Sequence, residues 1–210
     1  MIMKKILSTT ISLAAILSIC HVENIVAAEN LTLDTKGYIR DWIMLAPIPL
    51  PDRGTTGDLL LKDQVKDEIN LRPKAGETIK VNQTELIWKK ISSSKIFFDF
   101  NAILDSLNDR AAGFMVTYIE CEEDIPDVMM SVGSNDQGRI YFNGVDIYAF
   151  TDTRPLEIDA DKGRVTLKKG LNVIVFKVIN ENNSWQGSMR LTDMAGNPLK
   201  SLKIRLSPEE

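Results

Sequence analysis

The chain has 210 residues, a formal net charge of −4 and 44% hydrophobic residues. The acidic balance argues against a nucleic-acid partner, because nucleic-acid-binding surfaces need clustered basic residues. The apolar content is that of a globular chain rather than a disordered one, and the length suits one domain with a sizeable core.

The first residues have the order of a secretory signal peptide. Lys4 and Lys5 precede an apolar run from Ile6 to Ile19, and small residues follow up to Ala28. This order of charged, apolar and small residues is typical of export signals. The apolar run is shorter than the ~20 residues that a membrane-spanning helix needs, so we expect no transmembrane span after cleavage. We predict cleavage after Ala28.

The export signal divides the chain into residues 1–28 and a single domain at 29–210. We expect this domain to be exported to the periplasm, to the cell surface or into the medium. The alternative is a lipoprotein acylated at Cys20, although Ile19 stands before this cysteine, where a small residue is usual.

Export would remove residues that many catalytic and metal sites need. Cleavage after Ala28 takes away His21, which is the one histidine of the sequence, together with Cys20. Cys121 then has no internal disulfide partner, and its place in the alternating run FMVTYIECEE predicts a buried thiol. Ordinary zinc sites, Ser-His-Asp catalysis and Cys-His catalysis are excluded, whereas carboxylate chemistry and oxygen-ligated calcium remain open.

The first part of the domain predicts short elements. Residues 37–52 form a short strand that should end in a bend, because the three prolines of the stretch APIPLP cannot donate to a strand ladder. Residues 58–72 predict one short helix, since apolar residues recur there at near-helical spacing and Pro73 ends the pattern.

From about residue 95 onward, the sequence predicts strand after strand. Runs such as AAGFMVTYIECEE and LNVIVFKVINE alternate or are rich in β-branched residues, and turn signals separate them. The spacing of roughly 8–12 residues between turns is typical of sandwiches and barrels. We therefore expect an all-β fold, a two-sheet antiparallel β-sandwich of the jelly-roll type. A closed barrel is the alternative, because it uses the same alternation.

Three stretches of the chain, in this order, carry a resemblance to known domains: DWIMLAPIPLP, GSNDQGRIYFNG and VTLKKGLNVIVFKVINENNSWQGSMRLTDMAGNPL. Together they resemble the jelly-roll, galactose-binding-like carbohydrate-binding modules that are appended to many secreted bacterial enzymes and surface proteins. The hairpin style also resembles the protective-antigen-type sugar-binding domain, and these residues do not separate the two families. The resemblance covers residues 37–199 and implies a β-sandwich that binds glycan without catalysis.

The resemblance also implies a place for calcium. In protective-antigen-type adhesins, paired aspartates hold a calcium ion that ligates the sugar. Here the pair is Asn135-Asp136, so one carboxylate is missing. Asn135 and Asp136 can still offer oxygen ligands. Turn chemistry explains the same stretch equally well, including the Asn143-Gly144 pair, which is a strong hairpin signal.

A second acidic stretch, EIDADKGRV, contains Asp159 and Asp161. Hard oxygen ligands at alternate positions suit calcium, and a solvated charged turn accounts for the same pattern. No cofactor is certain from the sequence, and calcium is the one that these residues could hold.

The candidate ligand-binding residues are mostly aromatic. Sugar-binding surfaces combine a flat ring with polar groups, because the apolar face of a pyranose packs on the ring. Trp185 follows the polar stretch NENNS, which includes Asn183, and this is the best such combination in the chain. Arg190, Tyr141 and Trp88 complete the predicted set. The alternative for Trp185 is that it begins a strand and packs at the edge of the sandwich.

The sequence thus predicts an exported, non-catalytic module that binds glycan at a shallow surface. The alternative is a structural or protein-interaction sandwich of the cell envelope or of a secreted assembly, with an envelope protein as partner. Exposure of Trp185 and Tyr141 on one face would favour glycan binding, and burial of both would favour the interaction domain. We expect no enzyme, because no pair of acids lies in a recognisable catalytic setting.

Overall fold

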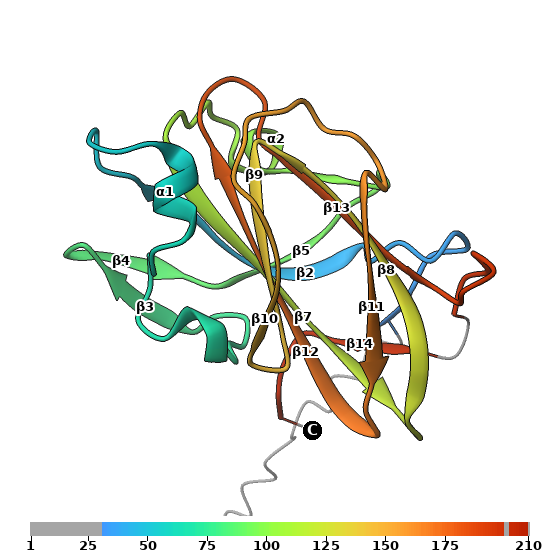
Figure 1. Cartoon of the computed structure of the whole chain (residues 1–210). Helices are drawn as coiled ribbons and strands as arrows, with labels where there is room; N and C mark the ends of the chain where they lie inside the picture. Colours follow the sequence, from blue (N-terminus) through green and yellow to red (C-terminus); the bar gives the residue numbers. More distant parts are fainter. Residues whose placement is uncertain (1–30, 200–201, 210) are drawn as a thin grey trace, which may run out of the picture.

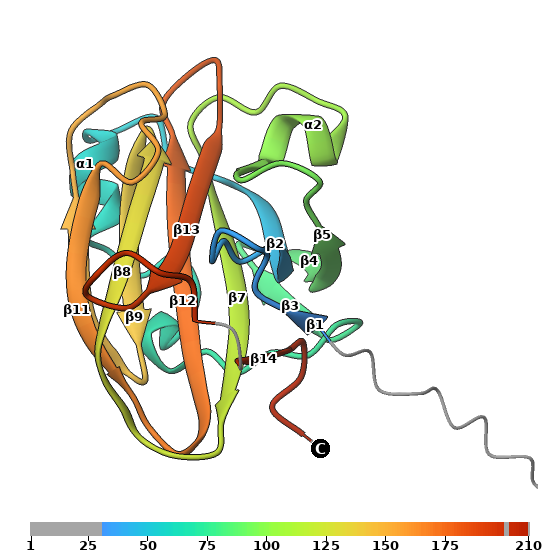
Figure 2. The same cartoon turned by 90° about the vertical axis from the view of Figure 1, so that its right-hand side faces the viewer.

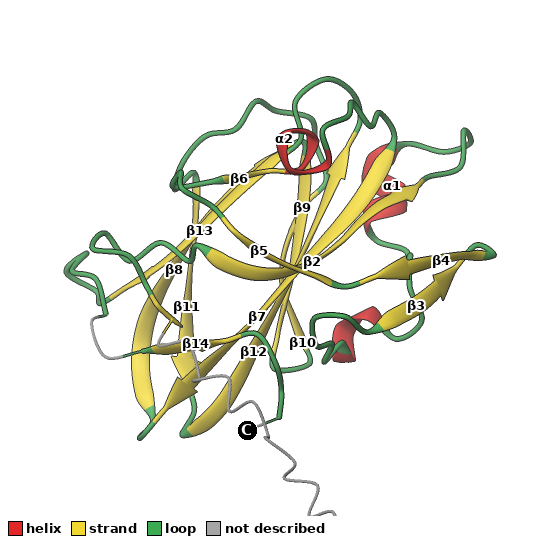
Figure 3. Cartoon of the chain, turned by 180° about the vertical axis from the view of Figure 1, so that it is seen from behind, coloured by secondary structure: helices red, strands yellow, loops and turns green. Residues whose placement is uncertain are grey.

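The computed structural model describes residues 31–199 and 202–209, and the predicted export signal, its cleavage site and Cys20 lie outside the described residues. Two antiparallel sheets dominate the fold (Figures 1 and 2), and its helices are short (Figure 3). The expectation of an all-β sandwich is confirmed. Within the described part of the chain, no helix is long and apolar enough to cross a membrane.

The larger sheet has eight strands in the order β1-β14-β7-β12-β9-β10, and β2 pairs with both β7 and β5. At its centre, β7 and β12 pair from Ala111 opposite Asn180 to Cys121 opposite Gly170. Both strands are buried on both faces, which suits their β-branched and aromatic content. The strands are β1 (Leu31–Thr32), β2 (Asp41–Pro49), β5 (Lys89–Ser92), β7 (Ala111–Cys121), β9 (Gln137–Phe142), β10 (Val145–Phe150), β12 (Gly170–Asn180) and β14 (Lys203–Arg205).

The smaller sheet has four strands in the order β11-β8-β13-β6, and a separate hairpin pairs β3 with β4. The strands are β6 (Phe98–Asp99), β8 (Ile125–Asn135), β11 (Asp161–Leu167), β13 (Gln186–Thr192), β3 (Thr78–Val81) and β4 (Thr84–Ile87). The helical elements are α1 (Thr56–Leu60), the 3₁₀ turn η1 (Glu68–Asn70) and α2 (Phe100–Leu104).

The larger sheet separates two hydrophobic cores. One core lies between the two sheets and includes Phe98, Phe176 and Cys121, which confirms the predicted burial of the thiol. The other core covers the outer face of the larger sheet and includes Leu60 and Phe114. Helix α1 and the β3–β4 hairpin supply part of this second core, and Figure 1 shows them on one side of the larger sheet.

The predicted proline bend is wrong, because β2 continues through two prolines. The register of β2 against β7 shifts between Leu45 and Ile48, so Pro47 lies where the ladder is already irregular. A proline at such an irregularity removes no regular ladder bond. Pro49 ends the strand.

The predicted single helix at 58–72 is two short pieces, α1 and η1. The reason is a competing hydrogen-bond donor from the sheet below. The Nζ of Lys177 donates to the carbonyl oxygens of Leu60 at 2.9 Å and Lys62 at 2.7 Å. Carbonyls that would continue the helix therefore accept from a lysine of β12.

The stretch GSNDQGRIYFNG is one hairpin turn and one crossing between sheets. Asp136 alone connects β8 of the smaller sheet to β9 of the larger sheet, and these two strands do not pair, so residues 133–138 do not form a hairpin. Asn143 and Gly144 join β9 to β10 and both have positive φ, at 50° and 77°. The second turn is therefore the tight hairpin that the Asn-Gly pair predicts.

Candidate functional site

Trp185, the ring on which we expected a sugar to stack, is fully buried. Its ring stacks on Phe100 with centroids 4.1 Å apart, and its Nε1 donates to the carbonyl of Val178 at 3.2 Å. A Cβ at Gly113 would lie only 2.7 Å from this ring. The prediction of an exposed Trp185 is thus wrong, since the ring fills the end of the core between the sheets.

Tyr141 and Trp88 are also buried, at 2% exposure each, in the core on the outer face of the larger sheet. The hydroxyl of Tyr141 donates to Glu68 at 2.6 Å. Burial, and then this bond, raise the pKa of Tyr141. We expected Tyr141 and Trp88 to bind a ligand at the surface. Both are instead buried, because η1 and the β3–β4 hairpin cover this face of the larger sheet.

Arg190 and Asn183 stay nearer to the surface. Arg190 pairs with Asp159 at 2.7 Å and lies over the ring of Tyr38. Asn183 is exposed, and its backbone is held, because its N–H donates to Asp109 at 3.0 Å. Of the predicted ligand set, Asn183 alone presents an exposed side chain.

The acidic stretch around Asp159 and Asp161 is already neutralised by arginines. Asp159 pairs with Arg190, and Asp161 pairs with Arg154. Within residues 31–199 and 202–209, no three His, Cys, Asp or Glu side chains come close enough to hold a metal ion.

Asn135 and Asp136 lie at the crossing between the two sheets and are 9% and 5% exposed. The carboxylate of Asp136 accepts from the backbone N–H of Glu181 at 2.8 Å, and burial raises its pKa. This carboxylate holds the loop that follows β12.

The structure brings together two stretches that the sequence presents as separate candidates: the predicted calcium ligands Asn135 and Asp136, and the polar stretch NENNS that precedes Trp185. At one end of the sandwich, Asp136 binds the loop that begins at Glu181. A carboxylate oxygen of Glu181 accepts from Thr153 at 2.8 Å and from Thr56 at 3.3 Å, and Gln137 donates to Thr56 at 2.9 Å. We call these five residues the polar loop end.

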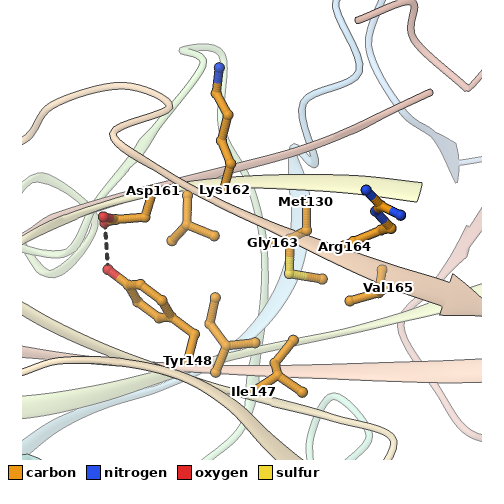
Figure 4. A pocket seen from close by; sticks show the side chains of 10 residues that line it. Met130, Ile147, Tyr148, Asp161, Lys162, Gly163, Arg164 and Val165 are labelled. Atoms are coloured by element: carbon orange, nitrogen blue, oxygen red, sulfur yellow. Dashed lines mark hydrogen bonds between the residues drawn. The ribbon is translucent and has the colours of Figure 1, made fainter. Parts of the chain in front are cut away.

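A pocket of about 90 Å³ lies where the sandwich is open at its side. Strand β10 is the last strand of the larger sheet and β11 is the first strand of the smaller one, and the two are not paired. We call the space between them the edge pocket. It is lined by Met130, Val132, Ile140, Ile147, Tyr148, Asp161, Lys162, Gly163, Arg164 and Val165 (Figure 4).

The edge pocket exists partly because of Gly163. Side chains on β11 alternate, so Gly163 shares the inward face with Asp161 and Val165, whereas Figure 4 shows Lys162 pointing away from the pocket. A Cβ at Gly163 would meet no heavy atom within 4 Å. The missing side chain therefore leaves room in the wall of the pocket.

One end of the edge pocket is polar. The hydroxyl of Tyr148 donates to Asp161 at 2.7 Å (Figure 4). Arg154 donates to Tyr148 at 2.9 Å and also to Asp161. Burial opposes ionisation of Asp161, but the bonds from Arg154 and Tyr148 outweigh it and hold its pKa below the usual value. Burial, and then the bond to Asp161, raise the pKa of Tyr148. The groups thus form a fixed, ionised pair with a neutral phenol.

Sequence reasoning missed the edge pocket. Its one local signal is Gly163 inside an alternating strand, which can mark a site where another group approaches closely. The neighbours that make it a pocket come from β8, β9 and β10, which the sequence does not align with β11.

No model of a protein family and no curated protein matches this chain. Among solved structures, the chain is similar to the PA14 domain of MpAFP antifreeze protein, with 10% sequence identity and a TM-score of 0.43. The match covers 88% of this chain and 99% of that domain. At this distance the likeness says nothing about function.

Proposed function

We propose that this chain is an exported, non-catalytic β-sandwich that binds another protein in a cell-envelope or secreted assembly. The observation that carries the proposal is the edge pocket, which has an apolar floor and lies between two strand edges that no described strand pairs with. Burial of Trp185 and Tyr141 supports it, because it removes the rings on which a sugar would stack. The predicted export signal ending at Ala28 supports the location.

The chemistry of the edge pocket suits binding rather than catalysis. Asp161 is the one carboxylate among the residues that line it, and Arg154 and Tyr148 hold this group ionised. A glycosidase needs two carboxylates across a cleft, one of them able to carry a proton at working pH. We infer instead that the apolar pocket receives a side chain of a partner, with the fixed Asp161–Arg154 pair at one end.

Site-specific cross-linking in producing cells tests the proposal. Ile147 is 39% exposed at the mouth of the pocket, and replacing it with the photo-reactive amino acid benzoylphenylalanine is expected to capture a partner that mass spectrometry identifies. Ile87 is 44% exposed on β4 and serves as the matched control position. Equal or absent adducts at the two positions would refute the proposal, as would an adduct at Ile147 that survives filling of the pocket by Gly163→Leu.

Glycan binding is the second candidate, and the polar loop end is the observation that favours it. Glu181 and Thr153 offer oxygens there beside the exposed Asn183. A glycan array with and without a chelator tests this candidate, with Asn183→Ala as the variant that is expected to lose binding. No binding to any glycan under either condition would remove it.

A further inference from the structure

The edge pocket also indicates what kind of partner fits, and this inference rests on the proposed function. Strand β11 pairs with β8 from Asp161 to Leu167, and its other edge is unpaired among the described strands. A free edge can accept an extended peptide as an added strand, with main-chain hydrogen bonds supplying affinity and pockets supplying specificity. The ladder of β11 with β8 is regular from Asp161 to Val165, on both sides of Gly163, and shifts only between Val165 and Leu167. Strand β10 is a poorer template, because its ladder with β9 shifts between Asp146 and Tyr148, beside the pocket residue Ile147.

An added strand beside β11 would alternate in step with it. One of its side chains would lie next to Gly163 and enter the edge pocket, since same-face neighbours on adjacent strands lie about 5 Å apart. The side chains before and after it would point outward, beside Lys162 and Arg164. The missing side chain at Gly163 thus gives the added strand its register.

The pocket selects an aliphatic side chain. Met130, Val132 and Ile140 belong to its lining, and all three are part of the buried core between the sheets. Ile147 and Val165 add apolar walls. A space of about 90 Å³ suits a single aliphatic side chain rather than a sugar ring, because drug-sized ligand pockets are several times larger.

The outer face of β11 selects acidic neighbours. Lys162 is exposed, and Arg164 is 62% exposed in an ion pair with Asp127 at 3.4 Å, itself 61% exposed. A pair this open to solvent contributes little, so an incoming carboxylate can take the place of Asp127. Complementary charge of this kind favours partner choice and register.

The geometry points to one occupant: an extended segment of a partner protein, with an aliphatic residue between two acidic residues, that pairs with β11 and inserts the aliphatic side chain at Gly163. Pairing with the free edge of β11 supplies the backbone hydrogen bonds. The pocket binds the central aliphatic side chain, and Lys162 and Arg164 pair with the acidic residues on either side of it. The polar loop end plays no part in this contact.

Short blocked peptides with Val, Leu, Ile or Met between two glutamates test the inference. Amide NMR spectra of the exported chain are expected to show saturable shifts along β11 with at least one peptide at millimolar concentration or below. A peptide with serine at the centre is expected to bind roughly tenfold more weakly, since it cannot fill the apolar pocket. Equal binding of the serine peptide would overturn the inference, as would the absence of shifts on β11 with all four aliphatic peptides.

Two variants sharpen the test. Gly163→Leu is expected to fold normally, because its Cβ enters open space, and to weaken binding at least roughly tenfold. Lys162→Glu with Arg164→Glu is expected to abolish binding, while Lys169→Glu with Lys203→Glu changes the net charge equally at exposed positions elsewhere and is expected to leave it intact. Undiminished binding by Gly163→Leu, with a native spectrum, would refute insertion at this position.

Failure of this inference and failure of the proposed function give different results. A cross-link at Ile147 in cells, without peptide binding at β11, keeps the protein-binding function and rejects the added strand. Peptide binding at β11, without a cross-link at Ile147, keeps the added strand and rejects the partner complex in the producing cell.

Discussion

Replacing Lys177 with methionine is expected to be among the most destabilising single substitutions in the chain. Lys177 and Glu68 form a salt bridge at 2.8 Å with both side chains at 0% exposure. Methionine keeps the length of the side chain but leaves the carboxylate of Glu68 buried without its cation. Burial also lowers the pKa of Lys177, against the opposing effect of Glu68, which shows how closed this site is to water.

The magnitude follows from what each partner loses. Removing one member of a buried ion pair costs about 3–5 kcal/mol, because an uncompensated charge stays buried. The loss here includes the bonds of Lys177 to the carbonyls of Leu60 and Lys62, which hold the segment after α1 on the sheet. In a domain of this size, each kcal/mol shifts the melting temperature by about 2–4 °C, so a fall of roughly 6–20 °C is expected.

Urea unfolding followed by tryptophan fluorescence measures the free energy, and hydrogen exchange of residues 60–70 reports local detachment of the segment. The double substitution Lys177→Met with Glu68→Leu is the control, because apolar replacement of a whole buried pair is often close to neutral. A loss below about 1 kcal/mol for Lys177→Met, or no recovery in the double variant, would refute the reasoning about this pair.

Three further predictions concern the core, the glycines and pH. Trp185→Ala is expected to lower the unfolding free energy by about 3–5 kcal/mol in urea titrations, and a loss near zero would contradict its burial. Gly133→Ala is expected to destabilise, since its Cβ would lie 2.2 Å from the carbonyl oxygen of Glu157, whereas Gly163→Ala is expected to be neutral or stabilising by up to about 1 kcal/mol; similar melting temperatures for the two would refute the comparison. Because the pKa of Asp161 is lowered on folding, its stabilising contribution is present at neutral pH and lost as pH falls through that lowered pKa. The stability difference between the native chain and Asp161→Asn should therefore shrink in acid, and a pH-independent difference would count against the pair with Arg154.

Local patterns in the sequence predict much of the fold. The alternation and β-branched content of residues 111–121 and 170–180 indicate the two central strands, because side chains on a strand point alternately to its two faces. The Asn143-Gly144 turn and the buried Cys121 follow from equally local evidence. These features depend on neighbours in the chain, so one stretch at a time suffices to predict them.

The candidate site could not be predicted in this way. Trp185 has a polar stretch before it, but its burial is decided by Phe100 and Gly113, which belong to other elements. The same holds for Tyr141, whose hydroxyl bonds to Glu68, 73 residues away in the chain. Exposure is a property of the packed molecule, and a flat aromatic beside polar residues serves a core and a sugar site equally well.

The sequence by itself determined the all-β class and the strand-forming runs, because these depend on residue type and short-range order. The tertiary structure alone decided where the molecule is open. The edge pocket requires β10 and β11 to end two different sheets and Gly163 to face inward between them. The burial of Lys177 requires Glu68, 109 residues away, to lie above it. Long-range packing, rather than local pattern, therefore formed both the buried Lys177–Glu68 pair and the proposed binding site.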